Sequence, residues 1–325
     1  MGLFSQNNGF DRNPGLGMEI AVGTTATLIS FLAILLIPVA GVVAGVLTPL
    51  PTLLSLYRRG RPVGYWGPGV TVLAGVLLLL VLGMPQIVPY FCLLLSMGVL
   101  MGLGMRRQWS IEKTIGVPTL FVFVVGAFLF WLAAGDSETG FAGFVEEDLR
   151  NSIRAAMQQY GGEGEEKKVL EQSLQNMVPF LVKLLPGAAV STTLLAAWFN
   201  VVAARRYCRM ARLPFPVWGQ WLEWKAPDHL IWGVIAAGVM LLVPGKTLTV
   251  VGLNLLLILA TVYLFQGLAI LGFYFERWKM PRAMRLLSYG IVLLQQFATM
   301  AVILLGLFDL WCDFRRLTRK PAESP

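Results

Sequence analysis

Apolar runs long enough to cross a bilayer dominate the chain, and short polar stretches separate them. Nine runs have this character: residues 20–37, 40–57, 68–83, 86–104, 115–134, 187–204, 229–244, 248–274 and 286–308. A helix that crosses the roughly 30 Å hydrocarbon core needs about 20 apolar residues, and several runs are near the short limit. Pro38 and Gly41 mark either a tight hairpin or a kink in one long helix. The pattern therefore predicts an all-α, polytopic membrane helix bundle with nine helices, or eight.

The longest run, Leu248 to Tyr274, contains no charged residue but carries Asn254, Tyr263 and Gln266. A helix of this length rises about 40 Å, so it crosses a bilayer with tilt. At about 100° per residue, Gln266 and Gly267 lie within about 60° of Tyr263, whereas Asn254 lies on the opposite face. We expect Asn254 to hydrogen-bond a neighbouring helix. Tyr263, Gln266 and Gly267 are candidate ligand-binding residues, with helix packing as the alternative.

The composition supports the membrane class. The 325 residues are 56% hydrophobic and only 14% charged, whereas soluble proteins average about 25% charged residues. The net charge of +8 comes from basic clusters at the ends of apolar runs. This arrangement favours contact with the anionic head groups of a lipid bilayer and argues against nucleic acid as a partner. No basic region precedes the first run, so we expect no cleaved signal peptide.

The basic clusters also predict orientation. Four clusters occur between runs, within 58–61, 106–113, 205–212 and 277–285. With the nine runs as spans, all four lie on one side, which the positive-inside rule makes cytoplasmic. A full span at 286–308 then sends the basic tail to the other side. Either the rule is broken there or the last helix does not cross, and we expect a crossing helix.

These runs divide the chain into five parts: a cytoplasmic segment 1–19, a first transmembrane group 20–134, an extracytoplasmic loop 135–186, a second transmembrane group 187–308 and a basic tail 309–325. In the loop, apolar residues recur every fourth position at Val145, Leu149, Ile153 and Met157, which predicts an amphipathic helix. A second such helix begins at Lys167 and is expected to be interrupted at Pro179. The two helices either lie on the outer membrane face or act as a lid over a pocket.

Small residues predict close helix contacts. Ala40 with Ala44 and Gly41 with Gly45 lie on adjacent helix faces, where two backbones can approach closely. The same spacing recurs in Gly98 with Gly102 and in Gly233 with Ala237. Packing within one bundle and docking of another subunit both account for these faces.

A charged motif follows the last run, with Asp309, Asp313, Arg315 and Arg316. The spacing of Asp309, Asp313 and Arg316 places them on one helix face, where an Asp–Arg pair is usually structural. Binding of a cation or a partner is the alternative.

Enzyme chemistry finds no support in the sequence. The three cysteines lie far apart, His229 is the single histidine, and the apolar runs contain no paired carboxylates. Hydrolase and metalloprotease motifs are missing as well. We therefore expect a protein that is not an enzyme and has no catalytic residue, no metal site and no cofactor.

Several short motifs together carry a family resemblance. They are Pro49-Leu50-Pro51, Arg59-Gly60, Leu185-Pro186, Asn200, Arg205-Arg206, Trp224-Lys225-Ala226-Pro227, Asn254, the stretch from Tyr263 to Gly267 and the stretch from Gly306 to Arg315. In this order they resemble the YybS-like family of predicted bacterial membrane proteins. The resemblance implies residence in the bacterial cytoplasmic (inner) membrane. It also implies a fold similar to the S components of energy-coupling-factor vitamin transporters.

Such S components have six helices with both ends cytoplasmic, and they dock a transmembrane coupling subunit driven by ATPases through small-residue faces. Only Ala40 and Ala44 match that docking pattern here, and no vitamin-pocket residue is carried over. Two functions follow as hypotheses. One is a small-molecule transport or substrate-binding subunit with a pocket at Tyr263 and Gln266. The other is a non-transporting membrane scaffold or envelope assembly factor.

Overall fold

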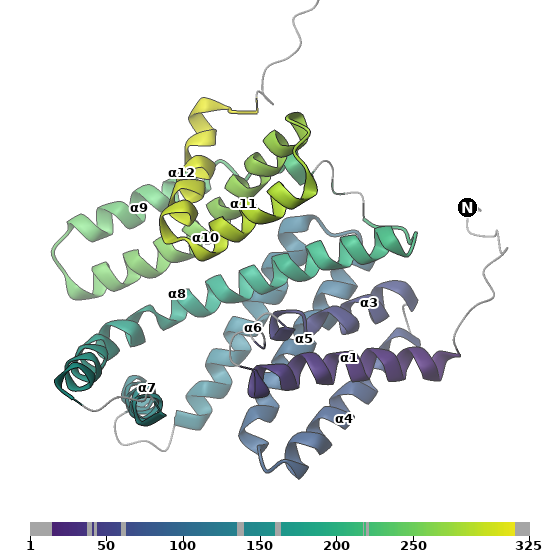
Figure 1. Cartoon of the computed structure of the whole chain (residues 1–325), viewed down its shortest axis with the longest axis horizontal. Coiled ribbons are helices and arrows are strands. Elements are labelled where there is room, and N and C mark those ends of the chain that lie inside the picture. The colour runs from purple at the N-terminus through teal and green to yellow at the C-terminus, as the bar shows by residue number, and fades with distance from the viewer. Residues whose placement is uncertain are drawn as a thin grey trace, which may run out of the picture. The chain divides into compact units, whose positions relative to one another are not determined.

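The computed structural model describes residues 15–37, 41, 44–59, 63–134, 140–159, 164–216, 218 and 221–315, and every regular element in this part is a helix (Figure 1). The α-helices are α1 (Leu16–Leu36), α3 (Pro49–Arg59), α4 (Trp66–Val81), α5 (Val88–Arg106), α6 (Ile111–Ala134), α7 (Gly140–Gln159), α8 (Glu165–Met210), α9 (Leu230–Leu242), α10 (Lys246–Arg277), α11 (Arg282–Leu294) and α12 (Gln296–Cys312). Short 3₁₀ turns lie at Val63–Tyr65, Pro85–Ile87 and Trp221–Glu223. The prediction of an all-α fold is confirmed.

Five helical segments in the described part are long and apolar enough to cross a membrane: Gly17–Leu36, Pro85–Arg106, Ile111–Leu132, Glu165–Met210 and Lys246–Arg277. The pair α11 and α12 makes a sixth if its two arms count as one span. Helices α4 and α9 are apolar but shorter. The structure thus supports several membrane helices, and the expected count of eight or nine is not confirmed.

The expected run at 40–57 differs from the prediction. A turn at Leu47 and Thr48 interrupts the run, and α3, which begins at Pro49, has 11 residues with Pro49, Thr52, Leu53 and Leu56 buried. Proline suits the first turn of a helix, but it lacks the N–H group that a helix continuing from before it would need. The described part of this stretch is therefore broken by a turn before the short amphipathic helix α3 and is not one continuous helix.

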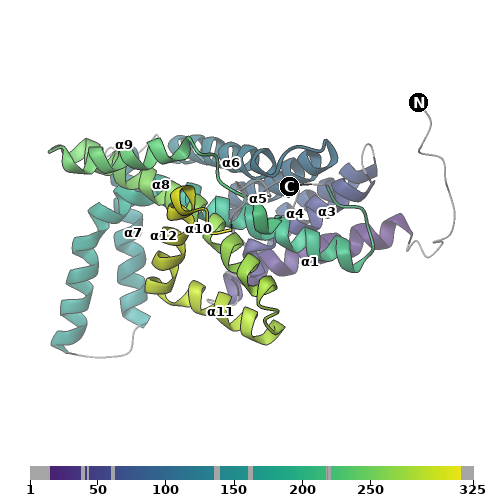
Figure 2. The same ribbon diagram turned by 90° about the horizontal axis from the view of Figure 1, so that it is seen from above.

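The expected single helix at 286–308 is also wrong. Gln295 has an extended backbone, with φ −104° and ψ 113°, and it separates α11 from α12. The two helices bend by 101° at this break, as the corner in Figure 2 shows. The hydroxyl of Thr299 donates to the carbonyls of Val292 and Gln295. The bond to Val292 satisfies a carbonyl at the end of the interrupted helix, whereas the Gln295 carbonyl also accepts the backbone N–H of Thr299.

The expected interruption at Pro179 does not occur. Helix α8 continues for 46 residues through both Pro179 and Pro186. Helix α7, by contrast, forms as predicted, with Val145 and Met157 buried.

The chain divides into two compact units. Unit 1 comprises 1–126 with 196–216, and unit 2 comprises 127–195 with 217–325. In unit 1, Phe31, Leu79, Phe91 and Leu95 form a buried cluster. Helix α5 packs closely on α3, because a Cβ atom at Gly102 would lie 2.8 Å from the Leu53 carbonyl oxygen.

Polar contacts tie the ends of α1 and α3 together within unit 1. The Arg59 Nε donates to the carboxylate of Glu19 over 2.7 Å, and Arg58 lies 3.7 Å from the same group. Glu19 stands at the start of α1 and Arg59 at the end of α3. The start of α1 and the end of α3 therefore lie next to each other.

Candidate functional site

Unit 2 contains a discontinuous helical segment, residues 222–242, that runs antiparallel to α10. The contacts pair Leu222 with Gly272, Ala226 with Gln266, Gly233 with Leu259 and Ala237 with Gly252. As the chain advances from Leu222, its partners on α10 therefore move steadily towards Lys246. Only the second half of this segment is the regular helix α9, while 224–229 contains no helix.

The irregular backbone of this segment takes its hydrogen bonds from side chains of other elements. The guanidinium Nη1 of Arg315 donates to the carbonyls of Leu222, at 2.6 Å, and Trp224, at 3.1 Å. The N–H of Ala226 donates to Oε1 of Gln266 over 3.1 Å. Non-helical backbone at membrane depth needs such partners, since lipid offers none.

One carboxylate joins these side chains. Asp309 Oδ2 accepts from Gln266 Nε2 at 3.0 Å and from Arg315 Nη2 at 2.8 Å. Its Oδ1 accepts from the N–H of Phe314 at 3.0 Å. The side chains of Arg315 and Asp309 are 0% and 1% exposed. We call Gln266, Asp309 and Arg315 the polar node.

Burial of the charged side chains in the polar node costs desolvation free energy, which the hydrogen bonds of the node offset. A buried ion pair stays favourable only when further hydrogen bonds satisfy its remaining polar atoms. Beyond the bond that joins them, Asp309 and Arg315 each make two further hydrogen bonds. The Nε–H of Arg315 is buried without a partner in the described residues. The node thus connects α10, α12 and the irregular segment.

Helices α10 and α12 cross at two glycines beside the node. A Cβ atom at Gly267 would overlap the carbonyl oxygen of Val302, and one at Gly306 would overlap that of Tyr263. Only glycine allows this approach. Tyr263 is 4% exposed and Gln266 is 2% exposed.

The structure therefore brings Gln266, Gly267 and the backbone carbonyl of Tyr263 together against α12. Both polar ends of the Gln266 amide bond within the chain. Their ligand-binding role stays a prediction.

Asn254 lies on the other side of α10 and contacts α8 next to Pro186. Its Oδ1 accepts from the N–H of Gly187 at 2.5 Å, and its Nδ2 donates to the carbonyl of Lys183 at 2.8 Å. In a regular α-helix these two backbone groups, four residues apart, bond to each other. The Asn254 amide thus bridges the helix where Pro186 disturbs it.

A similar contact lies beside Pro179. Proline has no N–H, so the carbonyl of Gln175 loses its helical donor. The Nη1 of Arg150, on α7, donates to this carbonyl at 3.2 Å and to the Gln175 side chain at 3.0 Å. This contact explains how α8 continues through a residue expected to end it.

The C-terminal charged motif pairs differently from the spacing-based prediction. Asp309 binds Arg315, whereas Arg316 lies outside the described residues. Helix α12 ends at Cys312, and Asp313 takes a left-handed conformation with φ 40°. The helical spacing therefore stops before the arginines, and the turn brings Arg315 back onto Asp309.

The small-residue face near residue 41 packs within unit 1. A Cβ atom at Gly41 would overlap the carbonyl of Ala33, and one at Gly45 would overlap the side chain of Ile34. Ala44 is half-buried, and Ala40 lies outside the described residues. The proposed docking role of these residues stays a prediction. Gly102 and Gly233 pack within the chain as expected.

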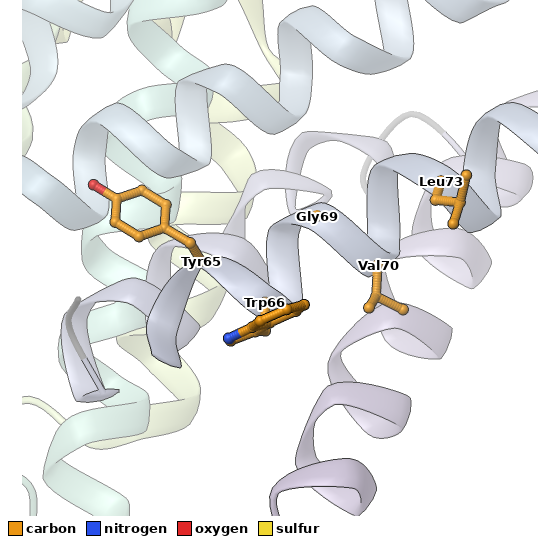
Figure 3. Close-up of a pocket in the computed structure, with 5 residues that line it drawn as sticks. All are labelled: Tyr65, Trp66, Gly69, Val70 and Leu73. Carbon is orange, nitrogen blue, oxygen red and sulfur yellow. The ribbon is translucent and has the colours of Figure 1, made fainter. Parts of the chain in front are cut away.

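Unit 1 also has an apolar hollow of about 490 Å³. Tyr65, Trp66, Gly69, Val70 and Leu73 line it along the start of α4 (Figure 3). It includes no node residue. Across the described part of the chain, no group of three or more His, Cys, Asp or Glu side chains forms a candidate metal site.

Sequence reasoning missed Arg150, Gly306 and the backbone of 222–226 as parts of these contacts. One signal was available, because a proline inside a helix frees the carbonyl four residues earlier. Which side chain would bond that carbonyl depends on tertiary packing.

Comparison with protein families gives one match. Residues 25–310 match the family described as "Predicted membrane protein (DUF2232)", and the chain belongs to this family. Neither curated proteins nor solved structures give a match.

Proposed function

Because the chain belongs to a family of predicted membrane proteins, we propose that it is a small-molecule transport or substrate-binding membrane subunit. The observation that carries this proposal is the discontinuous segment 222–242, whose irregular backbone is bonded by the buried Asp309–Arg315 pair and Gln266. Transporters commonly build their binding sites from discontinuous membrane helices. Ionisable groups buried within membrane segments commonly mark transport pathways.

The binding site in this proposal is the face of α10 with Tyr263, Gln266 and Gly267. Helix α12 covers that face, so a ligand enters when α12 moves away from α10 and the Gln266 amide exchanges its internal partners for the ligand. A polar small molecule suits this exchange, because an amide released from two hydrogen bonds needs replacements.

The resemblance to S components adds a partner to the proposal. In this view the subunit docks a transmembrane coupling subunit and ATPases in the bacterial cytoplasmic membrane. Ala40 and Ala44 remain the candidate docking residues.

A membrane scaffold or assembly factor is the competing function. It relies on small-residue faces that are free to receive other helices. Gly41, Gly45, Gly98 and Gly102 instead contact helices of the same unit, so we favour transport.

The test is purification in lipid nanodiscs from the native membrane, followed by native mass spectrometry. We expect a bound small molecule, or a coupling subunit with ATPases. The double variant Tyr263→Ala with Gln266→Ala should lose at least about tenfold of the ligand occupancy. Asn254→Ala is the matched control, since it removes a polar side chain from the other face of α10 and should retain the ligand.

Two results would contradict the proposal. An envelope assembly partner without any small molecule or ATPase favours the scaffold. Unchanged ligand occupancy in the double variant, shown to be folded by size-exclusion chromatography, rejects the site at Tyr263 and Gln266.

A further inference from the structure

Helices α11 and α12 are each too short to cross a bilayer alone. They have 13 and 17 residues, which rise about 20 and 26 Å against a core of roughly 30 Å. Their 101° bend prevents them from adding up to one straight span. The positions where the pair begins and ends therefore indicate its path through the membrane.

The pair begins at the Arg277 end of α10. Between the helices the chain turns tightly, with the N–H of Met280 donating to the carbonyl of Phe275 at 2.9 Å. Arg285 Nε then donates back to the carbonyl of Met280 at 2.9 Å. The first turn of α11 is thus fixed beside the last turn of α10.

The pair also ends near that end of α10. The hydroxyl of Tyr274, three residues before Arg277, donates to the carbonyl of Phe314 at 3.0 Å. The contacts of α12 with α10 described above involve Tyr263, Gln266 and Gly267. All four α10 residues lie in the half of the helix that ends at Arg277, whereas α9 contacts Gly252 and Leu259 in the other half.

The outer side of α11 is apolar. Met284, Leu287, Ile291 and Leu294 follow each other at spacings of three, four and three residues, and they are 51%, 66%, 49% and 89% exposed. The opposite side faces α10, where the rings of Tyr289 and Phe275 pack with their centroids 5.5 Å apart. We call the four residues the α11 stripe.

Basic residues flank this apolar surface. Arg277, Lys279 and Arg282 are exposed and precede the stripe. Apolar side chains bordered by cations match a lipid leaflet, whose acyl chains lie beneath anionic head groups. The charge pattern therefore favours lipid over another protein as the occupant of this surface.

We infer that α11 and α12 form a re-entrant pair, which enters and leaves the membrane on the face of the basic cluster 277–285, with the α11 stripe in contact with the acyl chains of that leaflet. This path removes the conflict between a crossing last helix and the basic tail. It rests on contacts within unit 2 and does not depend on the proposed transport.

Cysteine labelling tests the path. In a background with Cys92, Cys208 and Cys312 replaced by serine, single cysteines are placed by Lys279→Cys, Glu323→Cys and Lys167→Cys. A membrane-impermeant maleimide should label the first two from one side and the third from the other. Labelling of Glu323→Cys from the side of Lys167→Cys would overturn the inference.

Spin labels in proteoliposomes test the lipid contact. Labels are attached at Met284→Cys, Leu287→Cys and Leu294→Cys. In this order, accessibility to oxygen should rise and accessibility to a polar nickel reagent should fall, because the helix goes deeper into the membrane towards Gln295. Equal, shallow depth at all three positions would show a helix lying on the surface. Exclusion of both reagents would show a protein partner, and either result contradicts the inference.

Discussion

Two helix contacts, α3–α5 in unit 1 and α10–α12 in unit 2, use the same backbone device but differ in their polar groups. Glycines at 98 and 102 let α5 approach the backbone of α3, and glycines at 267 and 306 do the same between α10 and α12. Only the second contact adds a buried ion pair, Asp309–Arg315. Close glycine packing therefore holds two helices together without charge.

The difference teaches what the buried polar groups do. In unit 2, four polar side chains, some buried and some partly exposed, bond backbone at interruptions of a helix. Arg315 and Gln266 form hydrogen bonds with the backbone of the irregular segment. Asn254 bonds the backbone of α8 beside Pro186, and Arg150 bonds that of α8 beside Pro179. The polar side chains thus permit interruptions in membrane helices, which a uniformly apolar bundle could not accommodate.

The largest expected effect comes from Asp309→Ala, which leaves Arg315 buried without its carboxylate. Breaking a buried pair in this way costs about 3–5 kcal/mol. Unfolding in mixed micelles with increasing detergent denaturant measures the loss. Asp309→Leu combined with Arg315→Met should recover part of it, because no unpaired charge remains. A double variant as unstable as the single one would contradict this account of the pair.

Next in size are Gly306→Ala and Gly98→Ala, which place a Cβ atom against backbone in both contacts. Overpacking of this kind costs about 1–3 kcal/mol. Both variants should lose similar free energy of unfolding, because the glycine device is the same. The matched control is Gly290→Ala on α11, where a Cβ atom meets nothing within 4 Å. A control as destabilising as the other two would refute the steric explanation.

A smaller effect is expected for two asparagines. Asn254 uses both its amide oxygen and its nitrogen in bonds to α8. Asn200 donates to Val46 and Ala196, but its Oδ1 has no partner in the described part. Asn254→Ala should therefore cost about 1–2 kcal/mol and Asn200→Ala about half as much. The same unfolding assay compares them, and the reverse order would be inconsistent with the bonding described.

The smallest effect is expected for Arg150→Ala, at less than about 1 kcal/mol, because the side chain is partly exposed to solvent. Pro179→Ala restores the helical N–H for the Gln175 carbonyl. In that background the cost of Arg150→Ala should fall by about half. A double-mutant cycle measures both costs. Equal costs in the two backgrounds would show that Arg150 and Pro179 are not coupled and would contradict this prediction.

Local patterns in the sequence predicted much of the helical structure. The uncharged run from Leu248 to Tyr274 falls within α10, and the four-residue spacing from Val145 to Met157 falls within α7. The different directions of Asn254 and Gln266, about 120° apart around the helix, also follow from helical periodicity alone.

Breaks and partners could not be predicted in the same way. Hydropathy does not distinguish the corner at Gln295 from a continuous helix, and a proline does not end a helix when Arg150 bonds the freed carbonyl. The pairing of Asp309 with Arg315 needs the left-handed turn at Asp313. These features depend on tertiary contacts between residues far apart in the sequence.

Hydrogen–deuterium exchange in nanodiscs tests most directly whether the polar node holds the interrupted backbone. The variant Gln266→Leu keeps the side-chain volume but removes the bonds to Ala226 and Asp309. We predict faster exchange in peptides covering 221–228 and unchanged exchange in α3 and α5. Unchanged exchange at 221–228 would contradict the role of the node.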